Sequence, residues 1–110
     1  MVHASLRMKF ASEKLAEARE ILSSLVERTR VSPGCFGCDI YQDLLEPGVL
    51  LLEEWWNTQA ELDRRLRSVL YQPVILVMEM ALEFPTIRFS EISTMTGIET
   101  IKKSRCGLSF

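Results

Sequence analysis

The chain is short and nearly neutral: it has 110 residues, 47% of them hydrophobic and 25% charged, and a formal net charge of −2. This length predicts one domain over residues 1–110, and the charge balance argues against nucleic acid, which requires a basic surface. The longest apolar run, 74–78, is too short for a membrane span, and residues 1–10 lack the pattern of a signal peptide. We therefore expect a soluble cytoplasmic protein that has no membrane partner and keeps its cysteines reduced.

The first elements are a strand and a helix. Residues 2–10 alternate between apolar and polar side chains, and a period of two predicts a strand with one apolar face. Leucine, alanine and valine then recur at helical spacing through residues 15–26, which predicts a helix. Ser12 is its expected N-cap, because a serine hydroxyl can accept from a free backbone N–H. Pro33 should end the helix near Val31.

A hairpin and a second helical region follow. Runs 35–45 and 49–56 flank Glu46-Pro47-Gly48, and proline followed by glycine is typical of a turn, so we expect a β-hairpin. Thr58-Gln59-Ala60-Glu61 has the pattern of a capping box, in which the threonine accepts from an amide three residues on and the glutamate reaches back. It predicts a helix that continues, with a second segment opened by Pro73.

The last part of the chain predicts one more main strand, over residues 86–94. Pro85 should stop the helical region before it, and Gly97 should break the chain after it. The tail, 98–110, is ambiguous: its isoleucines could pack, whereas we expect Lys102 to Phe110 to be loose.

The predicted order is therefore β-α-β-β-α-β, which is the pattern of a ferredoxin-like α+β fold with an antiparallel sheet. Such a sheet carries helices on one face only. The hairpin strands hold apolar residues at both parities, so a second protomer should cover the bare face, which predicts a homodimer.

The sequence resembles the antibiotic biosynthesis monooxygenase family of dimeric α+β barrels, over a core of about residues 3–94. The resemblance depends on segments in a fixed order: Pro33-Gly34-Cys35, Asp39-Ile40-Tyr41-Gln42, Glu53-Glu54-Trp55, Thr58-Gln59-Ala60-Glu61-Leu62 and Leu66-Arg67-Ser68. It implies that two protomers join their sheets into a barrel, and that a small cavity lies between sheet and helices. Several members of this family oxidise aromatic, quinol-type substrates with O₂ and without metal or flavin, others degrade haem, and many have no known activity.

The resemblance also implies site residues. Trp55 corresponds to a tryptophan of the family, while Arg65 stands where a histidine is frequent and Leu51 where some members have an asparagine. Trp55 could stack on a flat quinol. Glu53, on the same strand face, could act as the base that deprotonates a phenolic hydroxyl, because phenolates pass an electron to O₂ more readily than phenols do.

Positive charge near this base could stabilise the phenolate, and Arg7, Arg65 and Arg88 are the candidates. Tyr41 could line the same cavity and, like Tyr71, could equally be a core or interface residue. Each candidate also has a plain structural interpretation: tryptophans fill cores and dimer interfaces, glutamates are solvated or ion-paired, and arginines on a helix flank pair with nearby acids.

Cys35-Phe36-Gly37-Cys38 has the C-x-x-C spacing of a redox or zinc motif. It enters a strand, where residues three apart face opposite sides, so we expect the two thiols to diverge. A zinc site would need Cys106 and His3 to join them, and His3 as a haem ligand would lie close to the terminus. We therefore expect no metal and no cofactor, and we interpret His3 as a partly exposed surface residue.

Two hypotheses remain open. The chain could be a small cofactor-independent monooxygenase that oxidises an aromatic or quinol-like substrate with O₂. Alternatively, it could be a non-catalytic binding or accessory protein that holds a small apolar molecule in the same cavity.

Overall fold

The computed structural model describes residues 1–106, and a four-stranded antiparallel sheet in the order β2-β3-β1-β4 is its centre. The elements are β1 (Val2–Lys9), α1 (Ser12–Arg30), β2 (Cys35–Gln42), β3 (Val49–Trp56), α2 (Gln59–Arg67), η1 (Val69–Tyr71), α3 (Gln72–Met80), β4 (Thr86–Glu91) and α4 (Ile98–Ser104). Strand order and element order confirm the predicted ferredoxin-like α+β fold.

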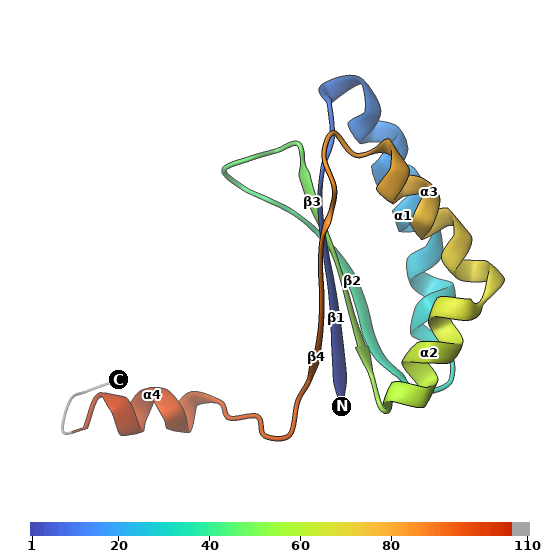
Figure 1. The fold of residues 1–110 in the computed structure, drawn as a ribbon. Helices are drawn as coiled ribbons and strands as arrows, with labels where there is room; N and C mark the ends of the chain where they lie inside the picture. The colour runs from blue at the N-terminus through green and yellow to red at the C-terminus, as the bar shows by residue number, and fades with distance from the viewer. Residues whose placement is uncertain (107–110) are drawn as a thin grey trace.

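The helices cover one face of this sheet only. Figure 1 shows α1, α2 and α3 on one side, the opposite side of the sheet uncovered, and α4 set apart from the rest of the chain. We call the uncovered side the open face and the other the helix face. None of the helices within residues 1–106 is both long and apolar enough to span a membrane.

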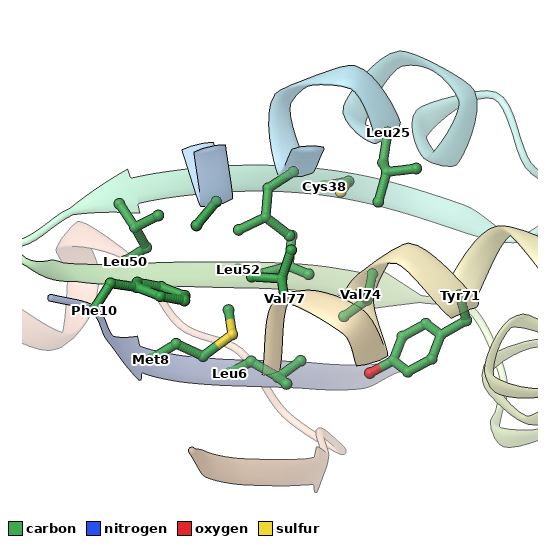
Figure 2. Close-up of a cluster of buried hydrophobic side chains, with 12 residues drawn as sticks. Leu6, Met8, Phe10, Leu25, Cys38, Leu50, Leu52, Tyr71, Val74 and Val77 are labelled. Atoms are coloured by element: carbon green, nitrogen blue, oxygen red, sulfur yellow. The ribbon is translucent and has the colours of Figure 1, made fainter. Parts of the chain in front are cut away.

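The strict alternation of β1 assigns its side chains to these two faces. Val2, Ala4, Leu6 and Met8 are buried, whereas His3, Ser5 and Arg7 between them are half-buried. On the helix face, Leu6 and Met8 join buried residues of β3, α1 and α3 in one cluster (Figure 2). Val2 and Ala4 pack with Trp56 and Leu62 in a second cluster. Each fully buried aliphatic side chain contributes about 1.5–3 kcal/mol to folding, so this face holds most of the free energy that stabilises the fold.

Both predicted helix starts are present, but their caps differ in detail. Helix α1 begins at Ser12, so its N-cap is Ala11, and Ser12 was the wrong residue; Ala11 is extended and its carbonyl accepts from Lys14 and Leu15. Thr58 does cap α2, because its Oγ1 accepts from the N–H of Glu61 at 3.2 Å. The reciprocal half of the box does not form within the described chain, since Oε2 of Glu61 is buried without a hydrogen-bond partner.

The β2–β3 hairpin is confirmed, although its first strand ends at Gln42 rather than at residue 45. Asp43 starts the turn, because its carboxylate accepts from the N–H groups of Leu45 and Glu46 at 2.8 and 3.0 Å. These two hydrogen bonds depress the pKa of the Asp43 carboxyl, as they favour its ionised form.

A bulge in β2 overturns the prediction that the two thiols of the C-x-x-C motif diverge. Cys35 lies opposite Trp56 and Cys38 opposite Glu54, with a register shift between Cys35 and Gly37. An extra residue in a bulge reverses the alternation, so both cysteines belong to the helix face. Cys38 is buried in the core cluster and Cys35 packs against it.

The C-terminal part differs from the prediction in two respects. Strand β4 ends at Glu91 instead of residue 94, and the tail forms α4 from Ile98 to Ser104. Lys102 to Ser104 are therefore helical, contrary to the prediction of a loose segment, whereas residues 107–110 lie outside the described chain. Every described side chain of α4 is exposed.

Candidate functional site

Strand β3 presents a glutamate and a tryptophan on each side of the sheet. Glu53 and Trp55 lie on the open face, together with Leu51. Glu54 and Trp56 lie on the helix face and are both buried. The sequence-predicted pair, Glu53 and Trp55, thus lies on the side that the helices leave uncovered.

A polar cavity of about 500 Å³ occupies the open face. Its lining residues come from the three adjacent strands β3, β1 and β4, and they are His3, Ser5, Arg7, Leu51, Glu53, Thr86, Arg88 and Ser90. The cavity brings together four of the candidates predicted from the sequence, Glu53, Arg88, Leu51 and Arg7. Its volume lies within the range of pockets that hold small-molecule ligands.

His3 links the candidate base to the candidate aromatic residue. Its ring stacks on Trp55, with ring centroids 4.1 Å apart and planes at 25°. Its Nε2 lies 3.5 Å from Oε2 of Glu53, a distance that is long for a hydrogen bond. Nε2 has no hydrogen-bond partner within residues 1–106, although the atom is buried. His3 therefore offers an unused polar atom beside the carboxylate.

The two cations of the cavity lie at different distances from this carboxylate: Arg7 is on the adjacent strand β1, and Arg88 is on β4 beyond it. Ser5 pairs with Glu53 on one side and with Arg88 on the other, so the two charged residues are separated by two strand spacings, about 10 Å between backbones. Arg7 lies within 3.6 Å of Glu46, in the β2–β3 turn, and is half-exposed. A flat molecule lying over Ser5 could contact Glu53 at one edge and a guanidinium at the other.

Three predicted residues are not among those that line this cavity. Trp55 adjoins the cavity only through the ring of His3, on which it stacks. Tyr41 is opposite Leu51 on the open face but belongs to the edge strand β2 and is exposed. Arg65 lies on the helix face and is buried. The structural interpretation of Arg65 as a solvated helix flank is also wrong, because only 3% of its side chain is exposed.

Arg65 forms a buried ion pair with Glu54. Its Nη2 and Nε donate to the two carboxylate oxygens at 3.0 and 3.2 Å. Nε1 of Trp56 donates to the same carboxylate at 2.9 Å, and the guanidinium lies over the ring of Tyr71, 5.1 Å from its centroid. Both carboxylate oxygens of Glu54 therefore accept hydrogen bonds within the fold.

A second, smaller cavity of about 120 Å³ adjoins the ion pair and is lined in part by Trp56, Glu61 and Arg65. It lies between the end of β3 and α2, on the side of the sheet where the family resemblance implies a cavity. A cavity of about 150 Å³ holds one benzene ring, so this space is too small for a fused-ring quinol.

Comparison with known proteins identifies the family. A family model described as antibiotic biosynthesis monooxygenase matches residues 1–74. The chain belongs to the antibiotic biosynthesis monooxygenase family. No curated protein matches its sequence significantly.

Solved structures agree with this family in fold. A proposed antibiotic biosynthesis monooxygenase from Deinococcus radiodurans is similar with a TM-score of 0.81 at 22% identity, over 89% of this chain and 98% of that one. Rv0793 from Mycobacterium tuberculosis gives a TM-score of 0.79 at 21% identity, over 87% and 98%. A conserved protein from Methanosarcina mazei Go1 gives 0.76 at 26% identity, over 81% and 89%.

Two features of this chain were not predicted from its sequence. They are the helix-face group of Glu54, Trp56 and Arg65, and the position of His3 beside Trp55. Pairing β1 with β3 as antiparallel neighbours would have placed His3 opposite Trp55. Nothing in the sequence distinguishes Glu54 from Glu53 as the buried one, since both strand parities of β3 are rich in leucine and tryptophan. Among residues 1–106, no three His, Cys, Asp or Glu side chains gather in a metal-binding cluster.

Burial on the helix face also changes acidities. Burial, and then the neighbouring Glu54 charge, raises the pKa of Cys38 to about 12. The same two causes raise the pKa of Tyr71 to about 12. Both groups therefore stay protonated and neutral, which suits a structural role.

Proposed function

We propose that this chain is a cofactor-independent monooxygenase that oxidises an aromatic, quinol-like substrate with O₂ in the open-face cavity. The observation that carries the proposal is the cavity itself: about 500 Å³, with a carboxylate, an unpartnered imidazole nitrogen and two arginines around it. In the balanced reaction, a substrate CH₂ group and O₂ give a C=O group and water. The substrate supplies all four electrons.

Glu53 is the proposed base. A phenol is a weaker acid than a carboxylic acid by about six pKa units in water, so proton transfer to a carboxylate costs about 8 kcal/mol there. Hydrogen bonds from Arg7 and Arg88 to the phenolate, at about 1.5–3 kcal/mol each, would offset much of this cost. Nε2 of His3 would donate to the carboxylate and orient it while the carboxylate takes the proton of the substrate hydroxyl, and Trp55 would contact the substrate ring.

A homodimer would complete the site by covering the open face. Within residues 1–106, β2 and β4 are the unpaired edges of the sheet. Large apolar side chains are exposed along both, among them Phe36, Tyr41 and Phe89. Unpaired edges with apolar side chains favour association. A second protomer over this face would exclude water and strengthen the electrostatic interactions inside the cavity. A micromolar sample that sediments as a monomer would overturn this part of the proposal.

The three cysteines are unpaired, as is usual in a reducing compartment. This supports our proposal that the protein is cytoplasmic.

A binding role without turnover is the second candidate, and Leu51 favours it. This side chain puts an apolar surface inside the cavity, at a position where the resemblance implies a polar amide in some members. The same cavity would then hold a small aromatic molecule without activating it.

Oxygen uptake with a panel of quinols and anthrone-like phenols separates the two candidates. We expect uptake by the wild type, and a loss of about 100-fold or more in Glu53→Gln, the usual contribution of a general base. Glu17→Gln, on the exposed side of α1, is the matched control and should retain full activity.

Tight binding without oxygen uptake across the panel would replace the enzyme proposal with the binding one. Uptake that is unchanged in Glu53→Gln would remove Glu53 from the mechanism.

A further inference from the structure

An apolar groove of about 490 Å³ lies between the end of α3 and the start of β4, on the side of β4 opposite to the open-face cavity. Ile75, Leu82, Phe84 and Ile87 supply its apolar wall, and Glu79 and Glu83 supply its acids. The apolar side chains are widely exposed, Phe84 to 86% and Leu82 to 61%. Large exposed apolar side chains that gather in a groove are typical of a site where another molecule docks.

The C-terminal arm, residues 93–106, has the complementary composition. It contains α4, in which Ile98 and Ile101 are 51% and 45% exposed. These two isoleucines are three residues apart and share one side of the helix, which Lys102 and Arg105 continue one turn later. A helix of seven residues is too short to be stable by itself in water, so α4 needs a surface to pack on.

We propose that α4 of a second copy of this chain docks in the α3–β4 groove. Ile98 and Ile101 would enter the apolar wall, as the apolar side of a short helix does in a groove. Lys102 and Arg105 would then lie beside Glu79 and Glu83. The match of apolar to apolar and of cation to acid fixes both the side and the direction of the helix.

The arm of the same chain cannot reach this groove. The backbone N–H of Ile92 donates to the carbonyl of Met1 at 2.8 Å, so the chain continues outward past the end of β4. The six residue steps from Thr86 to Ile92 cover about 20 Å of extended chain, and the six steps from Ile92 to Ile98 cover no more. No length of chain is left for the arm to turn back toward the groove. Figure 1 shows α4 leaving the sheet at the end of β4 opposite to α3.

This inference rests on the homodimer of the proposed function but not on its chemistry. A dimer that fails to oxidise any quinol leaves the arm proposal standing. If the dimer forms but its arm does not dock, the arm proposal is wrong and the proposed function is unaffected.

Cys106, exposed at the end of the arm, serves as a natural probe. One chain would carry Glu83→Cys with Cys106→Ser, and a second, tagged chain would keep Cys106 and Glu83. After mixing and mild oxidation, we expect a disulfide-linked species of both chains, at twice the 12.6 kDa of one chain. The control replaces the tagged chain with its Cys106→Ser variant and should give no such species.

A chain that carries Glu83→Cys and Cys106 together separates the alternatives. An intramolecular disulfide in that chain, with no mixed dimer, would show that the arm folds back and would overturn the proposal. Absence of both products would overturn it as well.

Charge reversal gives an independent test that leaves the cysteines alone. Lys102→Glu with Arg105→Glu should weaken dimerisation about two- to tenfold, and Glu79→Lys with Glu83→Lys should do the same. Combining all four should restore most of the loss. Additive weakening in the combined variant would contradict the pairing of these charges.

Discussion

The two sides of β3 carry the same chemistry in opposite settings. On each side a glutamate lies with a tryptophan and a basic residue: Glu54 with Trp56 and Arg65, and Glu53 with Trp55 and His3. The helix-face carboxylate and its arginine are 2% and 3% exposed and joined by direct hydrogen bonds. The open-face carboxylate and its histidine are 28% and 20% exposed, and their nearest polar atoms are 3.5 Å apart.

This difference shows how one strand can serve both stability and chemistry. A charge that is dry and fully paired cannot exchange its proton or its partners without a large free-energy cost. A charge that is partly hydrated and loosely paired can do both. The helix-face group therefore belongs to the fold, and the open-face group is the one that we propose to contact a substrate.

Removing Arg65 should have the largest effect on stability. Arg65→Met leaves the buried Glu54 carboxylate without its cation, and breaking a buried pair in this way costs about 3–5 kcal/mol. Urea unfolding at fixed protein concentration measures the loss. Arg88→Met, on the open face, is the matched control and should change the free energy of unfolding by less than about 0.5 kcal/mol.

The double variant Arg65→Met with Glu54→Gln sharpens this test, because it removes both buried charges and keeps an oxygen for Trp56 Nε1. It should recover most of the loss. If it is as unstable as Arg65→Met alone, the uncompensated carboxylate is not the cause.

Replacing the two tryptophans one at a time should affect different properties: stability for Trp56, and ligand binding for Trp55. Trp56 is 1% exposed, so Trp56→Ala should cost about 3–5 kcal/mol by opening a cavity in the core. Trp55→Ala loses mainly its contact with His3 and should cost about 1 kcal/mol. It should nevertheless abolish binding of a quinol probe, as measured by titration, while the dimer persists. Equal stability losses, or unchanged binding in Trp55→Ala, would break the contrast between the two faces.

Much of this fold could be predicted from sequence because its elements follow simple periodicities. The alternation of residues 2–10 fixed the strand and its apolar side, and Thr58 marked the start of α2. The position of Glu53 and Trp55 on one side of β3 followed from the same period of two.

The arrangement across the sheet could not be predicted with equal success. Both parities of β3 are apolar, so the pattern does not reveal which side meets the helices, and Arg65 was grouped with residues on the other side of the sheet. The bulge near Cys35 adds one residue that no periodicity records; Gly37, a glycine inside a strand, was the available signal. The predicted N-cap, Ser12, was one residue too late in the chain, because Ala11 already has the extended conformation of an N-cap.

Alkaline titration should sharpen the comparison by a smaller effect. Cys38 and Tyr71, both on the helix face, have pKa values of about 12, raised from 9.0 and 10.0 by burial and by Glu54. Between about pH 9 and pH 12 the unfolded chain loses these protons and the folded chain keeps them, so the folded chain binds more protons. The contribution of these two groups to the free energy of unfolding is therefore fully present below pH 9. It falls as the pH rises, by at most about 1.4 kcal/mol per pH unit for each group.

Cys38→Ala should reduce the decrease of the free energy of unfolding between pH 9 and pH 10. In this range Cys38 contributes strongly to the decrease and Tyr71 does not. Cys106→Ala, which removes an exposed thiol instead of a buried one, is the matched control and should leave the slope unchanged. Urea unfolding at a series of pH values measures both slopes. A Cys106→Ala slope that flattens as much as that of Cys38→Ala would mean that burial on the helix face does not control the titration, and the contrast with the hydrated open face would lose its electrostatic basis.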